Sequence, residues 1–295
     1  MSMFDWDSLA EKIQDDSLQD NKKGYQEDER FYKLAKDKNG NGGALIRFVP
    51  DKDGIPFIKM IKINADGGVN NRFCKDWSPQ SIGLPDPFNE MFVKLWKEGK
   101  KEEAKKFGRT IRYISNIKVI KDPANPDNEG KFFLLDMSQS LFDKVKKAVQ
   151  PTEDELALGA EPKQVFNPVQ GNSFLLKIKL GSNGIYTYED SKFNEKVDGI
   201  YDTEEEAMED IKKNAYSLKE FLEPSFYKSY DELKQCLNWF MGIENPPETK
   251  VTTEDVEKVV EPGKVEKVEK EKPKETKETK DVDLDDDLED LLNDI

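Results

Sequence analysis

A change of composition near residue 246 limits how much of this chain can fold. Residues 246–295 contain no aromatic residue, and Val-Glu-Lys-type repeats run through them. They carry 18 acidic residues against nine lysines. Such a segment cannot bury enough apolar surface to offset the conformational entropy lost on folding. We therefore expect a disordered acidic tail over residues 246–295 and a folded core within residues 21–245.

The charge of the chain is unevenly distributed. The formal net charge is −15, and the tail supplies more than half of it. Residues 91–121, by contrast, carry ten basic and three acidic residues. A basic stretch in the core beside a separate acidic tail is compatible with binding to an anionic polymer. The same basic stretch would also fit the solvated face of a helix.

Several classes of protein are disfavoured by what the sequence lacks. It has no run of eighteen apolar residues, so we expect no membrane span, and Asp5 and Asp7 argue against a secretory signal. It has no histidine and two cysteines, Cys74 and Cys236. We therefore expect no disulfide framework, and we expect a cytosolic location. Because histidine is absent, the commonest general base is also missing. We expect no catalytic activity and no cofactor.

Hydrophobic periodicity predicts a mixed α and β core. Glycine and asparagine at residues 39–43 indicate a turn. In the strand that follows, Ile46 and Phe48 should face the core and Arg47 the other side. Cys236 should lie on the apolar face of the last helix. The further strands expected are 57–63, 111–121, 131–136 and 173–180, and the helices expected are 88–107, one starting at Ser138, 203–222 and 229–241.

The first 20 residues read as a separate arm. Ser8 and Glu11 have the spacing of a capping box, which predicts a short helix. Trp6, Leu9 and Ile13 would share one face of it. An isolated helix of this length is marginal in water, so the arm should fold against something else.

Four segments resemble the single-stranded-DNA-binding, helix-destabilising proteins of T-even bacteriophages. They are residues 39–50, 121–131 and 188–193, and the Leu-Leu-Asn-Asp motif within residues 283–295. The resemblance implies an OB-fold β-barrel core with added helices (fold class α+β), a flexible cooperativity arm at 1–20 and a tail that binds partner proteins. It implies cooperative, sequence-independent coating of single-stranded DNA in phage replication, recombination and repair, in the host cell cytoplasm.

A DNA cleft of this kind needs cations for phosphates and aromatic rings for bases. The resemblance assigns Tyr188 to the cleft and places the segment from Arg109 to Tyr113 on its basic-aromatic strand. Tyr186 is inferred from strand periodicity, because it lies two residues before Tyr188. Leu135 replaces a cleft aromatic of the family, so binding per nucleotide should be weaker. The complete expected set is Arg47, Arg109, Arg112, Tyr113, Lys177, Tyr186 and Tyr188.

Protein partners are expected at both ends of the chain. Trp6, Leu9 and Ile13 should mediate head-to-tail self-association on DNA. The tail should recruit phage replication and recombination proteins and compete electrostatically with DNA for the cationic groove. The tail residues expected to bind partners are Leu284, Asp285, Asp286, Leu288, Leu291 and Leu292.

No structural zinc is expected. The zinc site of the family uses one histidine and three cysteines, and only Cys74 aligns with it. One thiolate cannot complete a tetrahedral site. We expect apolar packing instead, by the stripe Phe88, Met91, Phe92, Leu95 and Trp96.

Two alternative functions remain open from the sequence. The chain could be a phage adaptor that binds replication proteins and has no DNA cleft. It could also be a nuclease or related enzyme that uses carboxylate-bound magnesium. Binding to oligo(dT) would exclude the first alternative, and magnesium-dependent loss of DNA integrity would support the second.

Overall fold

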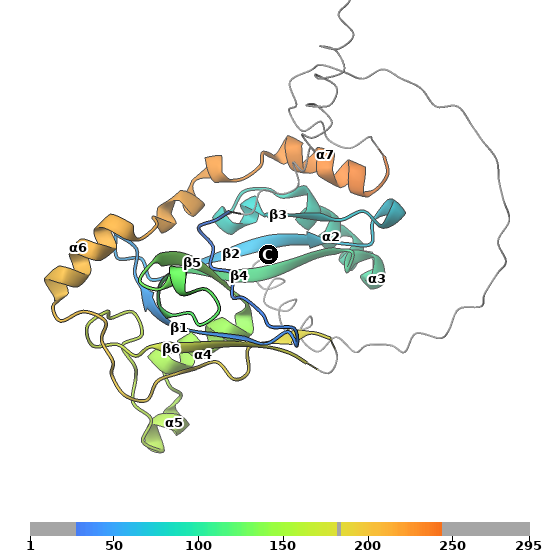
Figure 1. The fold of residues 1–295 in the computed structure, drawn as a ribbon. Helices are drawn as coiled ribbons and strands as arrows, with labels where there is room; N and C mark the ends of the chain where they lie inside the picture. The colour runs from blue at the N-terminus through green and yellow to red at the C-terminus, as the bar shows by residue number, and fades with distance from the viewer. Residues whose placement is uncertain (1–27, 182–183, 244–295) are drawn as a thin grey trace, which may run out of the picture. The chain divides into compact units, whose positions relative to one another are not determined.

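The computed structural model describes residues 28–181 and 184–243 (Figure 1). The chain divides into two units, Met1–Phe31 and Tyr32–Ile295. The described part of the first is residues 28–31, where Arg30 forms an ion pair with Asp28. The sheet and the helices belong to the second unit. Over the described residues, none of the helices has the length and apolar character needed to cross a membrane.

A curled antiparallel sheet forms the centre of this unit (Figure 1). Its strand order is β3-β2-β4-β1-β6-β7, with β5 paired to β4 and β8 paired to β6. Together with the helices, the sheet confirms the mixed α and β core expected from periodicity and the α+β class implied by the resemblance. The strands are β1 (Gly42–Val49), β2 (Ile58–Ala65), β3 (Cys74–Trp77), β4 (Phe107–Lys121), β5 (Phe132–Met137), β6 (Phe174–Leu180), β7 (Tyr186–Thr187) and β8 (Lys192–Phe193).

The 15-residue strand β4 joins the parts of the sheet. Its first half pairs with β2, from Phe107 opposite Ala65 to Ile114 opposite Ile58. Its second half pairs with β1, and residues 113–118 also pair with β5. The register between β1 and β4 shifts once, between Leu45 and Ile46. β4 therefore connects β2 and β3 on one side of the sheet with β1 and β6 on the other.

Most of the helices begin at a residue whose side chain caps them. Asp86 caps α2, Ser138 caps α4, and Ser229 with Glu232 forms a capping box on α7. The helices are α2 (Pro87–Lys97), α3 (Lys101–Ala104), α4 (Gln139–Val149), α5 (Glu153–Ala157), α6 (Glu204–Asn214) and α7 (Tyr230–Phe240). Single 3₁₀ turns lie at Val69–Asn71, Pro79–Ile82, Pro126–Asn128, Leu218–Leu222 and Pro224–Phe226.

Two expected helices are shorter than predicted. The helix expected over 88–107 is divided at Gly99, whose φ of 76° is left-handed, and β4 already begins at Phe107. The helix expected over 203–222 ends at Asn214. There the Asn116 side chain bonds both the N–H and the C=O of Tyr216, and so holds that backbone outside the helix.

Two apolar clusters stabilise the fold. The first lies between the sheet and α4 and includes Phe48, Ile117, Phe142 and Phe174. The second is formed by β2, β3, α2 and α7, where Phe88, Phe92 and Leu95 pack with Leu237 and Phe240. Met91 and Trp96 are partly buried against it. The stripe expected to replace the zinc site therefore does pack as apolar core, with Cys74 inside it.

Candidate nucleic-acid interface

Arg112 and Asp136 form an ion pair across neighbouring strands, β4 and β5. The Arg112 Nε donates to Asp136 Oδ1 at 2.6 Å, and its Nη2 donates to the Asp136 carbonyl at 3.1 Å. Both side chains keep about a quarter of their surface exposed, 26% and 24%. The carboxylate thus fixes the guanidinium plane at a surface that solvent still reaches.

Tyr188 lies within electrostatic reach of this pair. Its ring is partly buried against the first apolar cluster. Burial raises the pKa of its hydroxyl, the charge of Arg112 lowers it and the charge of Asp136 raises it further, with a net rise. The structure therefore brings together two residues, Arg112 and Tyr188, that the sequence analysis assigned to one cleft from distant segments.

A group of lysines surrounds Asp190, two residues beyond Tyr188. Lys179 forms an ion pair with the Asp190 carboxylate. The hydrogen bond from Lys179, and then the charges of Lys179, Lys177 and Lys144, hold the pKa of Asp190 below its ordinary value. Lys144 also donates to the carbonyl of Glu189 at 2.9 Å. Three ammonium groups around the Asp190 carboxylate make its surroundings locally cationic.

Tyr186 lies at the same edge of the sheet, on β7, where it pairs with Leu180 of β6 and not with Lys179. Its side chain is 42% exposed, and the Lys36 ammonium lies 3.7 Å from the centre of its ring. At that distance the ammonium forms a cation–π contact with the face of the Tyr186 ring. We define the β6–β7 surface as Lys36, Lys144, Lys177, Lys179, Tyr186 and Tyr188, with Arg112 at its border.

Three residues of this surface were missed by the sequence analysis. Lys179 alternates with Lys177 along β6, so strand periodicity could have found it. Lys36 and Lys144 lie far from Tyr186 and Glu189 in the sequence and meet them only through the fold. No local pattern marks either of them.

Tyr113 lies in the core. It is 9% exposed, and its ring stacks on Phe142 with centroids 3.7 Å apart and an interplanar angle of 6°. Its hydroxyl donates to Gln139 Oε1 at 2.8 Å. The position of Tyr113 in the core corrects its assignment to the cleft. Alternation along β4 turns Ile111 and Tyr113 inward while Arg112 stays at the surface.

Arg47 lies on the face of β1 opposite Ile46 and Phe48, as expected, but it does not reach solvent, which corrects its assignment to the DNA cleft. Its side chain is fully buried, and Nη2 donates to Ser173 Oγ at 3.1 Å and to the Asp198 carboxylate at 3.0 Å. The segment that contains Asp198 covers this face of the strand. A guanidinium in that position cannot reach a DNA phosphate without opening the fold.

Arg109 is buried as well. It is 5% exposed, donates from Nη1 to Gln80 Oε1 at 2.5 Å, and lies over the Phe92 ring. Burial lowers its pKa to about 10, although the charge of Asp86 raises it. Of the seven residues expected in the cleft, Arg112, Lys177, Tyr186 and Tyr188 therefore lie at the β6–β7 surface, and Arg47, Arg109 and Tyr113 lie inside.

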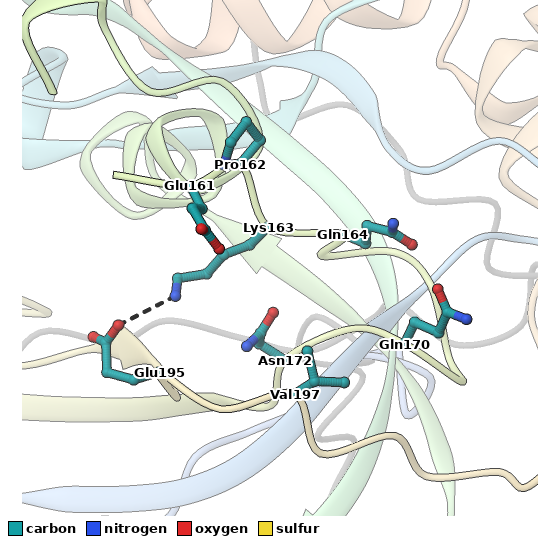
Figure 2. Close-up of a pocket in the computed structure, with 8 residues that line it drawn as sticks. All are labelled: Glu161, Pro162, Lys163, Gln164, Gln170, Asn172, Glu195 and Val197. Carbon is teal, nitrogen blue, oxygen red and sulfur yellow. Dashed lines mark hydrogen bonds and ion pairs between the residues drawn. The ribbon is translucent and has the colours of Figure 1, made fainter. Parts of the chain in front are cut away.

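Two pockets offer alternative sites. One, of about 320 Å³, has Glu161 and Glu195 on its wall, and Glu195 pairs with Lys163 at 3.3 Å (Figure 2). Its two carboxylates and lack of aromatic rings make it a poor site for a phosphate chain. The other, of about 380 Å³, is lined by Pro56, Phe57, Phe142, Val145, Lys146, Val149, Gln150 and Phe166. It is almost wholly apolar and holds no cluster of charges.

No metal centre accompanies these surfaces. In the part of the chain that the structure covers, no group of three or more Cys, Asp or Glu side chains could hold a metal ion. The absence of zinc stays a prediction. Trp6, Leu9 and Ile13, and the tail residues Leu284, Asp285, Asp286, Leu288, Leu291 and Leu292, lie outside the described residues.

Lysines placed around exposed and half-exposed aromatic rings on a curled sheet are the arrangement of a nucleic-acid-binding domain. Comparison with known proteins gives the same class. The family described as gp32 DNA binding protein like matches residues 40–241, and the chain belongs to this family.

Two relatives are named single-stranded DNA-binding protein. That of Enterobacteria phage T4 is 30% identical over 247 residues, which cover 81% of this chain and 80% of the relative. That of Enterobacteria phage T2 is 31% identical over 251 residues, with the same coverage of both chains. The chain is thus similar to these proteins over most of its length.

Proposed function

We propose that this protein binds single-stranded DNA, without sequence preference, along the β6–β7 surface. The observation that carries the proposal is the meeting of Arg112 with Tyr188 beside the lysines around Asp190. Membership of the family and the names of the T4 and T2 relatives support DNA of this form as the ligand.

The chemistry of the surface suits a ligand of any sequence. Lysine ammonium groups neutralise phosphates as point charges and release condensed counterions, which is independent of base identity. Tyr186 keeps 42% of its side chain exposed, and every base has a π face that can stack on such a ring. Lys36 restrains that ring before DNA arrives.

The Arg112–Asp136 pair makes one interaction with DNA conditional. Asp136 already neutralises the guanidinium in the absence of DNA. A phosphate must share Arg112 with this carboxylate or displace it. Asp136 therefore orients the Arg112 guanidinium but lowers the net contribution of Arg112 to the affinity for DNA. Both effects are common for ion pairs at binding interfaces.

The wider biological role is part of the same proposal. The core has an OB fold, which the curled antiparallel sheet and the family membership support. The protein coats exposed strands cooperatively during phage replication, recombination and repair, in the host cytoplasm. Residues 1–20 connect neighbours through Trp6, Leu9 and Ile13, and residues 246–295 recruit partner proteins and compete with DNA.

A salt titration of full-length protein against labelled oligo(dT), followed by fluorescence anisotropy, tests the proposal. We expect binding that weakens steeply with salt, and a smaller slope for Lys177→Ala/Lys179→Ala. Each cation removed from a phosphate should reduce the slope on single strands by about 0.7. Lys163→Ala, in the pocket of Figure 2, is the matched control. No binding by the wild type, or an unchanged slope for the double variant, would contradict the proposal.

A further inference from the structure

The two cysteines of the chain meet in the fold. Cys74 lies on β3 and Cys236 on α7, and α7 packs against β3. Cys74 is 8% exposed within the second apolar cluster, and Cys236 is partly buried against that cluster. Both are free thiols, and a hydrogen bond joins them. Nothing in the sequence pattern predicts this pairing.

An ion pair lies beside the thiols. Lys228 Nζ is 2.6 Å from the Asp76 carboxylate, and Asp76 is two residues from Cys74 on β3. The charge of Lys228 acts on both sulfurs. A lysine near a thiol favours the thiolate, which is the nucleophilic form of cysteine.

The two thiols are unequal. The hydrogen bond from Cys74 lowers the pKa of Cys236, and the charge of Lys228 adds to this effect. Burial and the charges of Asp76 and Glu232 oppose it, and the net change is a lower pKa. The pKa of Cys74 is raised by the same hydrogen bond and by its burial. Cys236 is also the more exposed of the two. A small oxidant should therefore react with Cys236 in its thiolate form. Cys74 lies beside it as the second thiol.

We propose that Cys74 and Cys236 form a reversible oxidation site, at which a peroxide closes a disulfide that links α7 to β3. This site is separate from the β6–β7 surface and does not depend on DNA binding.

The reaction has two steps. The Cys236 thiolate attacks one oxygen of hydrogen peroxide, the O–O bond breaks, and hydroxide leaves, which gives a sulfenic acid on Cys236. The Cys74 sulfur then attacks the Cys236 sulfur, the S–O bond breaks, and the departing hydroxide takes the Cys74 proton as water. Two thiols and one peroxide thus give one disulfide and two waters, and a dithiol reductant reverses the change.

The disulfide would hold the last described helix on the sheet. Leu233, Leu237 and Phe240 of α7 are fully buried in the second cluster, so α7 completes that core. A covalent link from β3 to α7 spans most of the folded chain and restricts the unfolded state accordingly. Oxidation should therefore stabilise the fold.

Full-length protein treated with a small excess of hydrogen peroxide tests the site. We expect the intact mass to fall by about 2 Da, the two alkylatable thiols to disappear, and peptide mapping to join Cys74 to Cys236 in a monomer. The melting temperature should rise by about 5 °C or more. Dithiothreitol should restore the starting mass and melting temperature.

Single variants provide the controls. Cys74→Ser should leave Cys236 to over-oxidise, with a gain in mass, and Cys236→Ser should keep one alkylatable thiol and show no rise in melting temperature. The proposal is overturned if wild-type Cys236 over-oxidises while Cys74 stays alkylatable in unfolded protein. Dimers linked through Cys236, or two unreacted thiols after treatment, would overturn it equally. The wild-type mapping decides the question even if a serine variant fails to fold.

Discussion

The guanidinium of Arg112 on β4 donates to the carboxylate of Asp136 on β5 with Nε and Oδ1 2.6 Å apart, and Tyr188 lies within the field of both charges. This relationship places a restrained cation beside a half-buried ring. It also makes Asp136 a competitor of any phosphate that approaches Arg112. Asp136 should therefore lower the affinity of the proposed interface for DNA.

Substitutions at the two partners should act in opposite directions. Arg112→Ala should weaken oligo(dT) binding and reduce the salt slope by about 0.7, because one phosphate no longer has its cation. Asp136→Asn should strengthen binding at low salt, because it removes a negative charge and frees the guanidinium. Anisotropy titrations at several salt concentrations measure both effects. Equal affinities for both variants and wild type would remove Arg112 from the interface.

The exposed tyrosine should separate binding from stability. Tyr186→Ala should cost about 1–3 kcal/mol of binding free energy if a base stacks on the ring. It should leave the melting temperature nearly unchanged, because the side chain is 42% exposed. Tyr230→Ala, on α7 and 38% exposed, is a matched control that should bind as wild type does. A similar loss in both variants would show that the effect of Tyr186 is not local.

Alternation along strands predicted much of this arrangement. The strand expected over 173–180 is β6, and alternation along it places Phe174, Leu176 and Ile178 in the core and leaves Lys177 and Lys179 exposed, because one face of β6 meets solvent. On β1 the same argument put Arg47 on the second face, but that face is not open to DNA, since the segment around Asp198 covers it. Alternation shows which side chains share a face; it does not show whether a distant segment covers that face.

The long-range pairs were beyond the sequence for the same reason. Lys36 over Tyr186, and Cys74 beside Cys236, depend on which strand and helix the fold places together. Caps at Ser138 and Ser229 were predictable, because a cap involves residues within one turn. Helix caps could therefore be predicted from the sequence, whereas the residues that make up the interface could be identified only once the sheet topology was known.

Tyr113 should affect stability first. Tyr113→Ala removes a ring stacked on Phe142 and should cost about 3–5 kcal/mol of unfolding free energy, as large-to-small core changes do. Tyr113→Phe removes only the hydrogen bond to Gln139 and should cost about 1 kcal/mol. Urea unfolding followed by circular dichroism measures both. If Tyr113→Ala instead melts as wild type does and loses oligo(dT) affinity, the ring belongs to the cleft.

The ion pair of the buried Arg47 with the partly exposed Asp198 should make stability depend on acid pH. Burial alone raises the pKa of Asp198, but hydrogen bonds from Ser173 and Asn194 and the charge of Arg47 bring it below its ordinary value of 3.8. A carboxyl whose pKa is lower in the folded state contributes stability above its unfolded pKa and loses it as pH falls through the folded pKa. Wild type should therefore lose stability steadily as pH falls below about 4.

Asp198→Asn should be less stable at pH 7, because Arg47 keeps its buried charge without a counter-ion. The difference in stability between Asp198→Asn and wild type should shrink toward pH 3. Urea midpoints measured between pH 3 and pH 7 give both curves, with Glu195→Gln as the control for an exposed carboxylate on the same segment. Parallel curves for wild type and Asp198→Asn over that range would show that the carboxylate at 198 does not hold Arg47 in the fold.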